Sequence, residues 1–177
     1  MSLAHALLAA IIEQPYSGYD LAKQFDGTVG FFWKASHQQI YRELSKLEAD
    51  GWVTAETIRQ AGRPDKKLFS PTELGQQHLL EWIAQPSEPS PPKEELLVKI
   101  FAGYLAPRQV IVEELERHRQ AHQEKLSVFQ ALEQRYFQNP QELPLEAKFR
   151  YLTLCRGIGY ETSWLTWCEQ ALQILSV

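Results

Sequence analysis

The sequence predicts a mainly α-helical protein with a small β component, an α+β N-terminal domain being followed by an all-helical one. Two observations support this fold class. Apolar residues recur three and four positions apart over most of the chain, which is the spacing of a buried helix face. Residues 52–58 are instead rich in β-branched side chains and precede a turn containing glycine and proline, which indicates a β-hairpin.

A proline-rich spacer divides the chain. Residues 86–92 contain four prolines in seven positions, and such a run cannot continue a helix and favours an extended segment. We therefore expect a domain over 1–85, a linker over 86–92 and a helical domain over 93–177.

Three helices are expected at the start of the first domain. Apolar spacing predicts a helix from Leu3 that ends before Pro15, and a short helix over 19–25 follows a turn at 16–18. Ser36 is a suitable N-cap for a third helix that ends near Gly51.

A hairpin and a fourth helix complete the first domain. The strands are expected at 52–58 and 67–69, around a basic turn at 59–65. Ser70 and Glu73 fit a capping box for the next helix, with Thr72 as a rival cap. Three helices followed by a two-stranded hairpin form a winged helix-turn-helix.

The charge distribution restricts how such a domain could bind DNA. The chain carries a net charge of −4, and residues 1–85 hold 8 Lys plus Arg against 10 Asp plus Glu. Any DNA affinity must therefore come from a local cluster rather than from bulk charge. The hairpin turn offers one, with Arg59, Arg63, Lys66 and Lys67.

The third helix has a face that suits the DNA major groove. Ile40, Leu44 and Leu47 form its apolar side, and polar or small residues lie opposite. Gln and Arg can pair with bases, whereas flanking Tyr and Lys reach phosphates. An ordinary solvated helix face is the alternative, and the adjacent basic hairpin favours DNA. The candidate DNA-binding residues are Ser36, His37, Gln38, Gln39, Tyr41, Arg42, Ser45, Lys46, Arg63, Lys66 and Lys67.

Over these same residues the sequence resembles the PadR-type transcriptional regulators. The resemblance rests on an ordered set of motifs that spans nearly all of residues 3–85: Pro15-Tyr16-Ser17-Gly18-Tyr19-Asp20-Leu21, Phe32-Trp33-Lys34-Ala35-Ser36, Gln39-Ile40-Tyr41-Arg42-Glu43-Leu44, Leu47-Glu48-Ala49-Asp50-Gly51-Trp52-Val53, Gly62-Arg63-Pro64 and Phe69-Ser70-Pro71-Thr72-Glu73-Leu74-Gly75. Pro71 stands where many members have an aliphatic residue. The resemblance implies a winged-helix domain that binds double-stranded DNA, a helical C-terminal dimerisation region like that of virulence activators, and, in most members, repression. It also places Tyr41 at the DNA.

The second half has the pattern of a dimerisation domain. A helix is expected over 93–105, and a long one from Pro107 to about Gln138 carries a heptad-like stripe with polar interruptions. The segment 145–175 is apolar on more than one face, so we expect a second chain to complete its core. Two-fold symmetry would then match a near-palindromic operator. The candidate dimerisation residues are Leu115, Leu126, Phe129, Leu152, Ile158, Trp164, Leu165 and Leu172.

Other sites are less favoured by the sequence. His118 and His122 are spaced to share a metal ion but have no third ligand of defined spacing. Cys155 and Cys168 are too far apart to bridge within one helix, and they indicate a reducing, cytoplasmic compartment in a bacterial cell rather than a redox switch. We expect no enzyme, cofactor, metal or membrane span. A small-molecule effector remains open, with Tyr104, Phe149, Trp164 and Trp167 as possible lining residues. A winged helix that binds protein rather than DNA is the alternative function.

Overall fold

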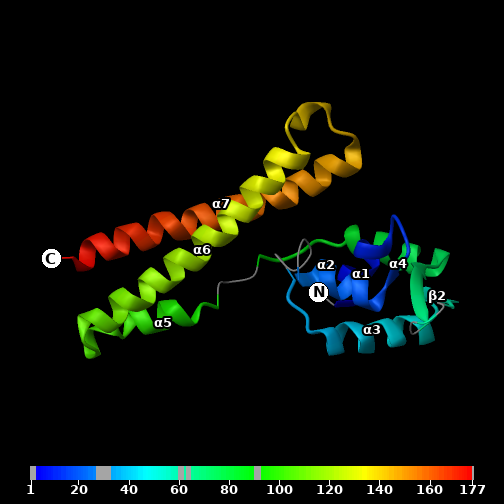
Figure 1. Ribbon diagram of the computed structural model, residues 1–177, viewed down its shortest axis with the longest axis horizontal. Helices are drawn as coiled ribbons and strands as arrows, with labels where there is room; N and C mark the ends of the chain where they lie inside the picture. Colours follow the sequence, from blue (N-terminus) through cyan, green and yellow to red (C-terminus); the bar gives the residue numbers. More distant parts are fainter. Residues whose placement is uncertain (1–2, 27–32, 60–61, 63–64, 90–92, 177) are drawn as a thin grey trace. The chain divides into compact units, whose positions relative to one another are not determined.

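The computed structural model describes residues 3–26, 33–59, 62, 65–89 and 93–176. Arg63 therefore lies outside the described residues. The chain separates into two compact units, Met1–Pro89 and Ser90–Val177. Each unit has its own packing and is described by itself (Figure 1).

Within its described residues, the first unit combines α-helices with a small antiparallel sheet (Figure 1). The strand order is β1-β3-β2, and β2 and β3 form the hairpin of the predicted wing. The elements follow one another as α1 Leu3–Ile11, β1 Tyr16–Ser17, α2 Gly18–Asp26, α3 His37–Ala49, β2 Val53–Ile58, β3 Lys66–Pro71 and α4 Glu73–Ile83. The winged-helix order expected from the sequence is confirmed.

One local prediction in this unit is wrong, and a second, left open between two caps, is decided by the structure. Residues 16–17, expected as a turn, form β1, because they pair with Phe69 and Leu68 of a strand about 50 residues away. The second concerns the start of α4. Thr72, not Ser70, is its N-cap, and Thr72 Oγ1 accepts a hydrogen bond from the Gly75 backbone at 3.0 Å. Ser70 is instead paired with Thr54 in the hairpin, so tertiary pairing decides between the two caps.

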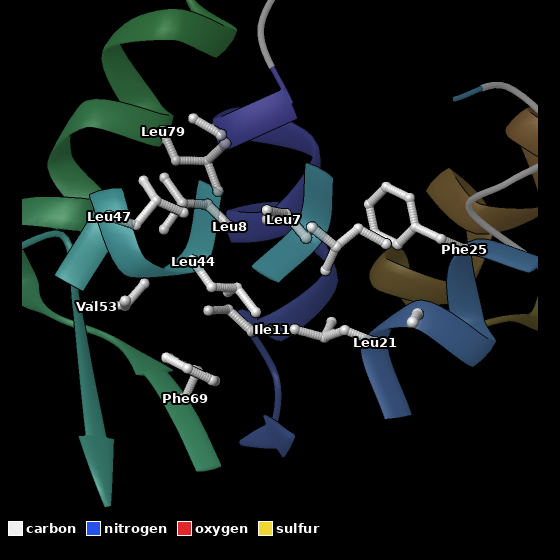
Figure 2. Close-up of a cluster of buried hydrophobic side chains, with 13 residues drawn as sticks. Leu7, Leu8, Ile11, Leu21, Phe25, Leu44, Leu47, Val53, Phe69 and Leu79 are labelled. Carbon is white, nitrogen blue, oxygen red and sulfur yellow. The ribbon is translucent and has the colours of Figure 1, made fainter. Parts of the chain in front are cut away.

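The core of the first unit joins all its helices to the sheet. Aliphatic side chains from α1, α2, α3 and α4 meet Val53 and Phe69 of the hairpin (Figure 2). On α3 the buried side chains are Ile40, Leu44 and Leu47, as the helical spacing predicts. This packing fixes which face of α3 is left in solvent.

The second unit is a long helical hairpin with a short helix beside it (Figure 1). Its elements are α5 Glu95–Phe101, the 3-10 turn η2 Gly103–Leu105, α6 Arg108–Tyr136, the 3-10 turn η3 Pro140–Glu142 and α7 Leu145–Leu175. The long helix after Pro107 is confirmed. The helix expected over 93–105 is interrupted, since α5 ends at Phe101 and a 3-10 turn follows.

The contact between α6 and α7 contains a buried polar pair. On α6 the buried residues follow the predicted heptad-like stripe, with His122 between Leu115 and Leu126. His122 Nδ1 contacts Glu161 Oε2 of α7, and both side chains are almost fully buried. The Trp164 ring stacks on His122 with ring centroids 4.7 Å apart. His122 is therefore held by contacts inside the hairpin.

None of the helices in the described part of the chain has the length and apolar character needed to cross a membrane.

Candidate nucleic-acid interface

The start of α3 is fixed by a capping box. Ser36 Oγ accepts a hydrogen bond from the Gln39 backbone N–H, and Gln39 Oε1 accepts one from the Ser36 backbone N–H at 2.8 Å. Each side chain thus satisfies a backbone N–H group that the first helical turn leaves unpaired. Both were predicted as DNA-binding residues. In this structure Ser36 Oγ and Gln39 Oε1 set the helix start, and a bidentate base contact by Gln39 would require breaking the cap.

The solvent-facing side of α3 carries most of the other candidates. His37, Gln38, Arg42, Ser45 and Lys46 are all exposed. Ser45 Oγ donates a hydrogen bond to the Tyr41 carbonyl at 3.1 Å, which holds it close to the helix. Within the described residues, no carboxylate forms an ion pair with Arg42 or Lys46, so both cations are available to an external anion.

Tyr41 packs against the first residue of α2. A Cβ atom placed on Gly18 would lie 2.4 Å from Tyr41 Cε1, so only glycine allows the ring to rest there. The ring is nevertheless 46% exposed. Tyr41 therefore lies at the edge of α3 nearest to α2, with one side packed and the other open to a ligand.

The wing is defined as β2, β3 and residues 59–65 between them, of which the structure describes 59, 62 and 65. Gly62 has a φ of +74°, a left-handed conformation that side chains rarely adopt, and Arg59 is exposed at the end of β2. The Gly62 position agrees with a turn at the wing tip.

The two wing lysines are paired with carboxylates of the helices. Lys66 Nζ lies 2.8 Å from Asp20 Oδ2 on α2, and Lys67 Nζ lies 2.7 Å from Glu48 Oε2 on α3. The hydrogen bond from Lys66, with that from Ser17, lowers the pKa of Asp20 below its ordinary value. Both carboxylates come from positions distant in the chain, Asp20 from α2 and Glu48 from α3.

Residues missed by sequence reasoning therefore include Asp20 and Glu48. Spacing could not reveal them, because each reaches its lysine only through the packing of the hairpin on the helices, β3 on α2 and β2 on α3. Lys34, exposed two residues before the Ser36 cap, is a further cation near the start of α3 that sequence reasoning missed.

The predicted dimerisation residues fall into two groups. Leu115, Leu126, Phe129 and Leu165 are buried between α6 and α7 of the same chain. The other members keep open surface: Leu152 is 62% exposed, and Ile158, Trp164 and Leu172 are half-buried. Large apolar side chains elsewhere in this unit are also exposed, namely Val98, Phe101, Tyr104, Leu105, Leu145 and Phe149.

Comparison with known proteins identifies the family. Residues 7–81 match the transcriptional regulator PadR-like family, and residues 92–176 match the virulence activator alpha C-terminal domain. A probable transcriptional regulator of Mycobacterium tuberculosis is 35% identical, with 99% of this chain and 98% of that protein covered.

Solved structures agree over the whole chain. Bacillus subtilis PadR in complex with operator DNA has a TM-score of 0.84 at 28% identity, covering 98% of this chain and 99% of that one. The same protein in complex with p-coumaric acid has a TM-score of 0.79 at 27% identity, covering 99% of each chain. The Vibrio cholerae virulence activator AphA has a TM-score of 0.78 at 30% identity, covering 98% of each chain. This chain belongs to the PadR-like family of transcriptional regulators, and its predicted role as a regulator rather than an enzyme is confirmed.

Proposed function

We propose that this protein is a dimeric repressor that binds double-stranded operator DNA, with α3 in the major groove and the wing against phosphates or the minor groove. The observation that carries the proposal is the exposed face of α3. It presents Gln38, Arg42 and Lys46 beside the hairpin, and the two cations have no ion pair within the described residues. The fold match to a PadR protein solved on operator DNA supports the same placement.

The residues of α3 divide into two roles. Gln38 and Arg42 have side chains that can pair with base edges, whereas Tyr41 and Lys46 on the flanks are suited to phosphate oxygens. We assign sequence reading to the first pair and sequence-independent affinity to the second. Arg59, exposed directly after β2, adds positive charge beside this face.

Fluorescence anisotropy on two duplexes tests this division. One duplex carries the region upstream of the protein's own gene and the other a random sequence of equal length. Arg42→Ala should reduce the preference for the first duplex by about 1–3 kcal/mol, the worth of one bidentate base contact. Lys46→Ala should weaken binding to both about equally. Binding to neither duplex by the wild-type protein at low salt would contradict the proposal and favour a protein-binding winged helix.

We propose residues 93–177 as the dimerisation domain, 1–85 as the DNA-binding domain and 86–92 as the linker. The exposed apolar residues of the second unit support a second copy as the partner. Phe101 is 88% exposed and Leu152 is 62% exposed, and apolar patches of this kind are typical of interfaces. A two-fold dimer would place two α3 helices on successive major grooves.

Light scattering tests the dimer. The wild-type protein should show twice the 20.4 kDa chain mass, and Leu152→Glu or Phe101→Glu should shift it toward the monomer. Ile83→Glu, on an equally exposed apolar residue of the first unit, is the matched control and should remain dimeric. A wild-type monomer at micromolar concentration would contradict this part of the proposal.

An aromatic small molecule is the proposed class of effector. Support comes from the related PadR structure with p-coumaric acid, at 27% identity. Trp164 and Trp167 of α7 contact each other edge to face and would report binding by their fluorescence. If p-coumaric acid changes neither this fluorescence nor DNA binding, it is not the effector. As a regulator of transcription, the protein would act in the bacterial cytoplasm.

A further inference from the structure

The feature that the DNA-binding proposal leaves unexplained is the pairing of the wing lysines. Lys66 and Lys67 are the cations that a wing would offer to phosphate, yet each already has a carboxylate within 2.8 Å. The paired side chains are all between 37% and 47% exposed, so the two pairs lie at the surface. A phosphate that approaches this surface meets two carboxylates as well as two lysines.

The carboxylates are held in place by their own elements. Asp20 Oδ2 accepts a hydrogen bond from Ser17 Oγ at 2.8 Å, and the Asp20 backbone N–H donates to the same hydroxyl at 3.1 Å. Glu48 lies in the last turn of α3, whose buried face is packed in the core. Neither carboxylate is on a loose segment, so each pair joins β3 to a fixed helix.

A paired lysine contributes less to DNA binding than a free one. Affinity for duplex DNA rises because each neutralised phosphate releases condensed counterions, and the dependence of log K on log salt has a slope of about −0.9 for each phosphate contacted. A lysine that stays on its carboxylate neutralises no phosphate. If it leaves, the uncovered carboxylate repels the same strand within the Debye length. Both outcomes reduce the DNA affinity that the wing adds.

We propose that Asp20 and Glu48 limit the sequence-independent part of the DNA affinity by neutralising Lys66 and Lys67. The inference rests on the proposed DNA-binding function and adds two affinity-limiting residues to it. Base reading by α3 then accounts for a larger share of the total binding. The acidic net charge of the chain is consistent with a protein that binds DNA weakly unless α3 finds its site.

The test measures anisotropy of a random 30-base-pair duplex across a range of salt concentrations, with the full-length protein. Glu48→Gln should steepen the slope by about 0.9, which corresponds to about eightfold tighter binding at 0.1 M salt. Asp20→Asn should act similarly through Lys66, and the double variant should show about twice the change in slope. Affinity for the upstream duplex should rise by the same factor, so that the preference for it over the random duplex stays constant.

Two controls separate neutralisation of a lysine from the removal of any negative charge. Glu56→Gln removes an exposed carboxylate from β2 that forms no ion pair within the described residues, and it should change the slope by less than half as much. In a Lys67→Gln background, Glu48→Gln should lose most of its effect. Thermal unfolding of each variant confirms that the fold is intact.

The outcomes distinguish this inference from the function on which it rests. If the wild-type protein binds DNA and neither Glu48→Gln nor Asp20→Asn changes the salt slope, the inference is overturned and the DNA-binding function stays in place. An equal change in slope from Glu56→Gln would also overturn it. So would a change from Glu48→Gln that persists in the Lys67→Gln background. Binding to neither duplex by any variant would overturn both.

Discussion

Substituting Gly18 by alanine tests whether the position of Tyr41 matters for DNA binding. The added Cβ would lie 2.4 Å from Tyr41 Cε1 and 2.9 Å from Cδ1. Carbon atoms in contact prefer about 3.5–4.0 Å, so the ring has to move by at least about 1 Å. The backbone at Gly18 has no positive φ, and the substitution therefore acts through the ring alone.

The cost to stability should be small. Tyr41 is 46% exposed, so its ring can turn toward solvent, and an off-rotamer torsion costs about 0.5–1.5 kcal/mol. Alanine is favoured over glycine in the middle of a helix by about 0.5–1 kcal/mol, and the gain is smaller at Gly18, the first residue of α2. These terms have opposite sign, so we expect the free energy of unfolding in urea to change by less than about 1 kcal/mol.

The effect on DNA binding should be larger. Loss of a hydrogen bond to a charged phosphate costs about 1.5–3 kcal/mol, so affinity for the upstream duplex should fall at least about tenfold. Tyr41→Ala should lose a similar amount, and Gly18→Ala should add nothing in that background, as a double-mutant cycle would show. Gly159→Ala, where an added Cβ meets no atom within 4 Å, is the matched control. Additive losses in the double variant would refute the reasoning, as would unchanged binding by Gly18→Ala.

Three further predictions concern stability. The pKa of Glu114 is lowered from 4.5 to about 2, first by Arg117 and then by Lys99. The ionised carboxylate therefore stabilises the fold above pH 4.5, and this stabilisation is lost as the pH falls toward 2. Glu114→Gln should flatten the dependence of the unfolding temperature on pH in this range. Glu161→Ala leaves the buried His122 Nδ1 without its hydrogen-bond partner and should cost about 1–3 kcal/mol in urea unfolding, whereas replacing both residues by leucine should cost far less. Leu44→Ala removes a fully buried side chain of α3 and should cost about 2–5 kcal/mol.

Each of these predictions has an outcome that would contradict it. An unchanged pH profile in Glu114→Gln would show that the carboxylate makes no net contribution in solution. A loss in the Glu161 and His122 double-leucine variant as large as that of Glu161→Ala would show that shape, not unpaired polarity, sets the cost. Protein concentration has to be equal across the series, because the proposed dimer would raise apparent stability as concentration increases.

Local sequence patterns predict most of the first unit. The spacing of Ile40, Leu44 and Leu47 gave the buried face of α3, and Ser36 gave its start, because caps and helix faces depend on neighbours only a few residues away. The two-residue strand β1 was missed for the opposite reason. Its pairing with Leu68 and Phe69 depends on a partner far along the chain.

The candidate interface was predicted less completely than the fold. Exposed polar residues of α3 follow from the helical wheel, and Arg42 and Lys46 are placed as expected. The state of the wing lysines does not follow from any local pattern. Lys66 pairs with a residue 46 positions earlier and Lys67 with one 19 positions earlier, and a charge count along the hairpin gives no indication of either pair.

In the second unit, too, a contact between distant positions decides the role of a polar residue. This residue is His122, which interrupts the apolar side of α6. From the sequence, His122 among leucines indicates a weak helix pairing. In the structure it meets Glu161, the buried acid of α7, and Trp164 covers the pair. Sliding α7 by one turn would separate the two groups and bury both without a partner, whereas a purely apolar stripe would tolerate the slip. The pair therefore fixes the register of α6 against α7, and with it which apolar side chains of α7 remain exposed.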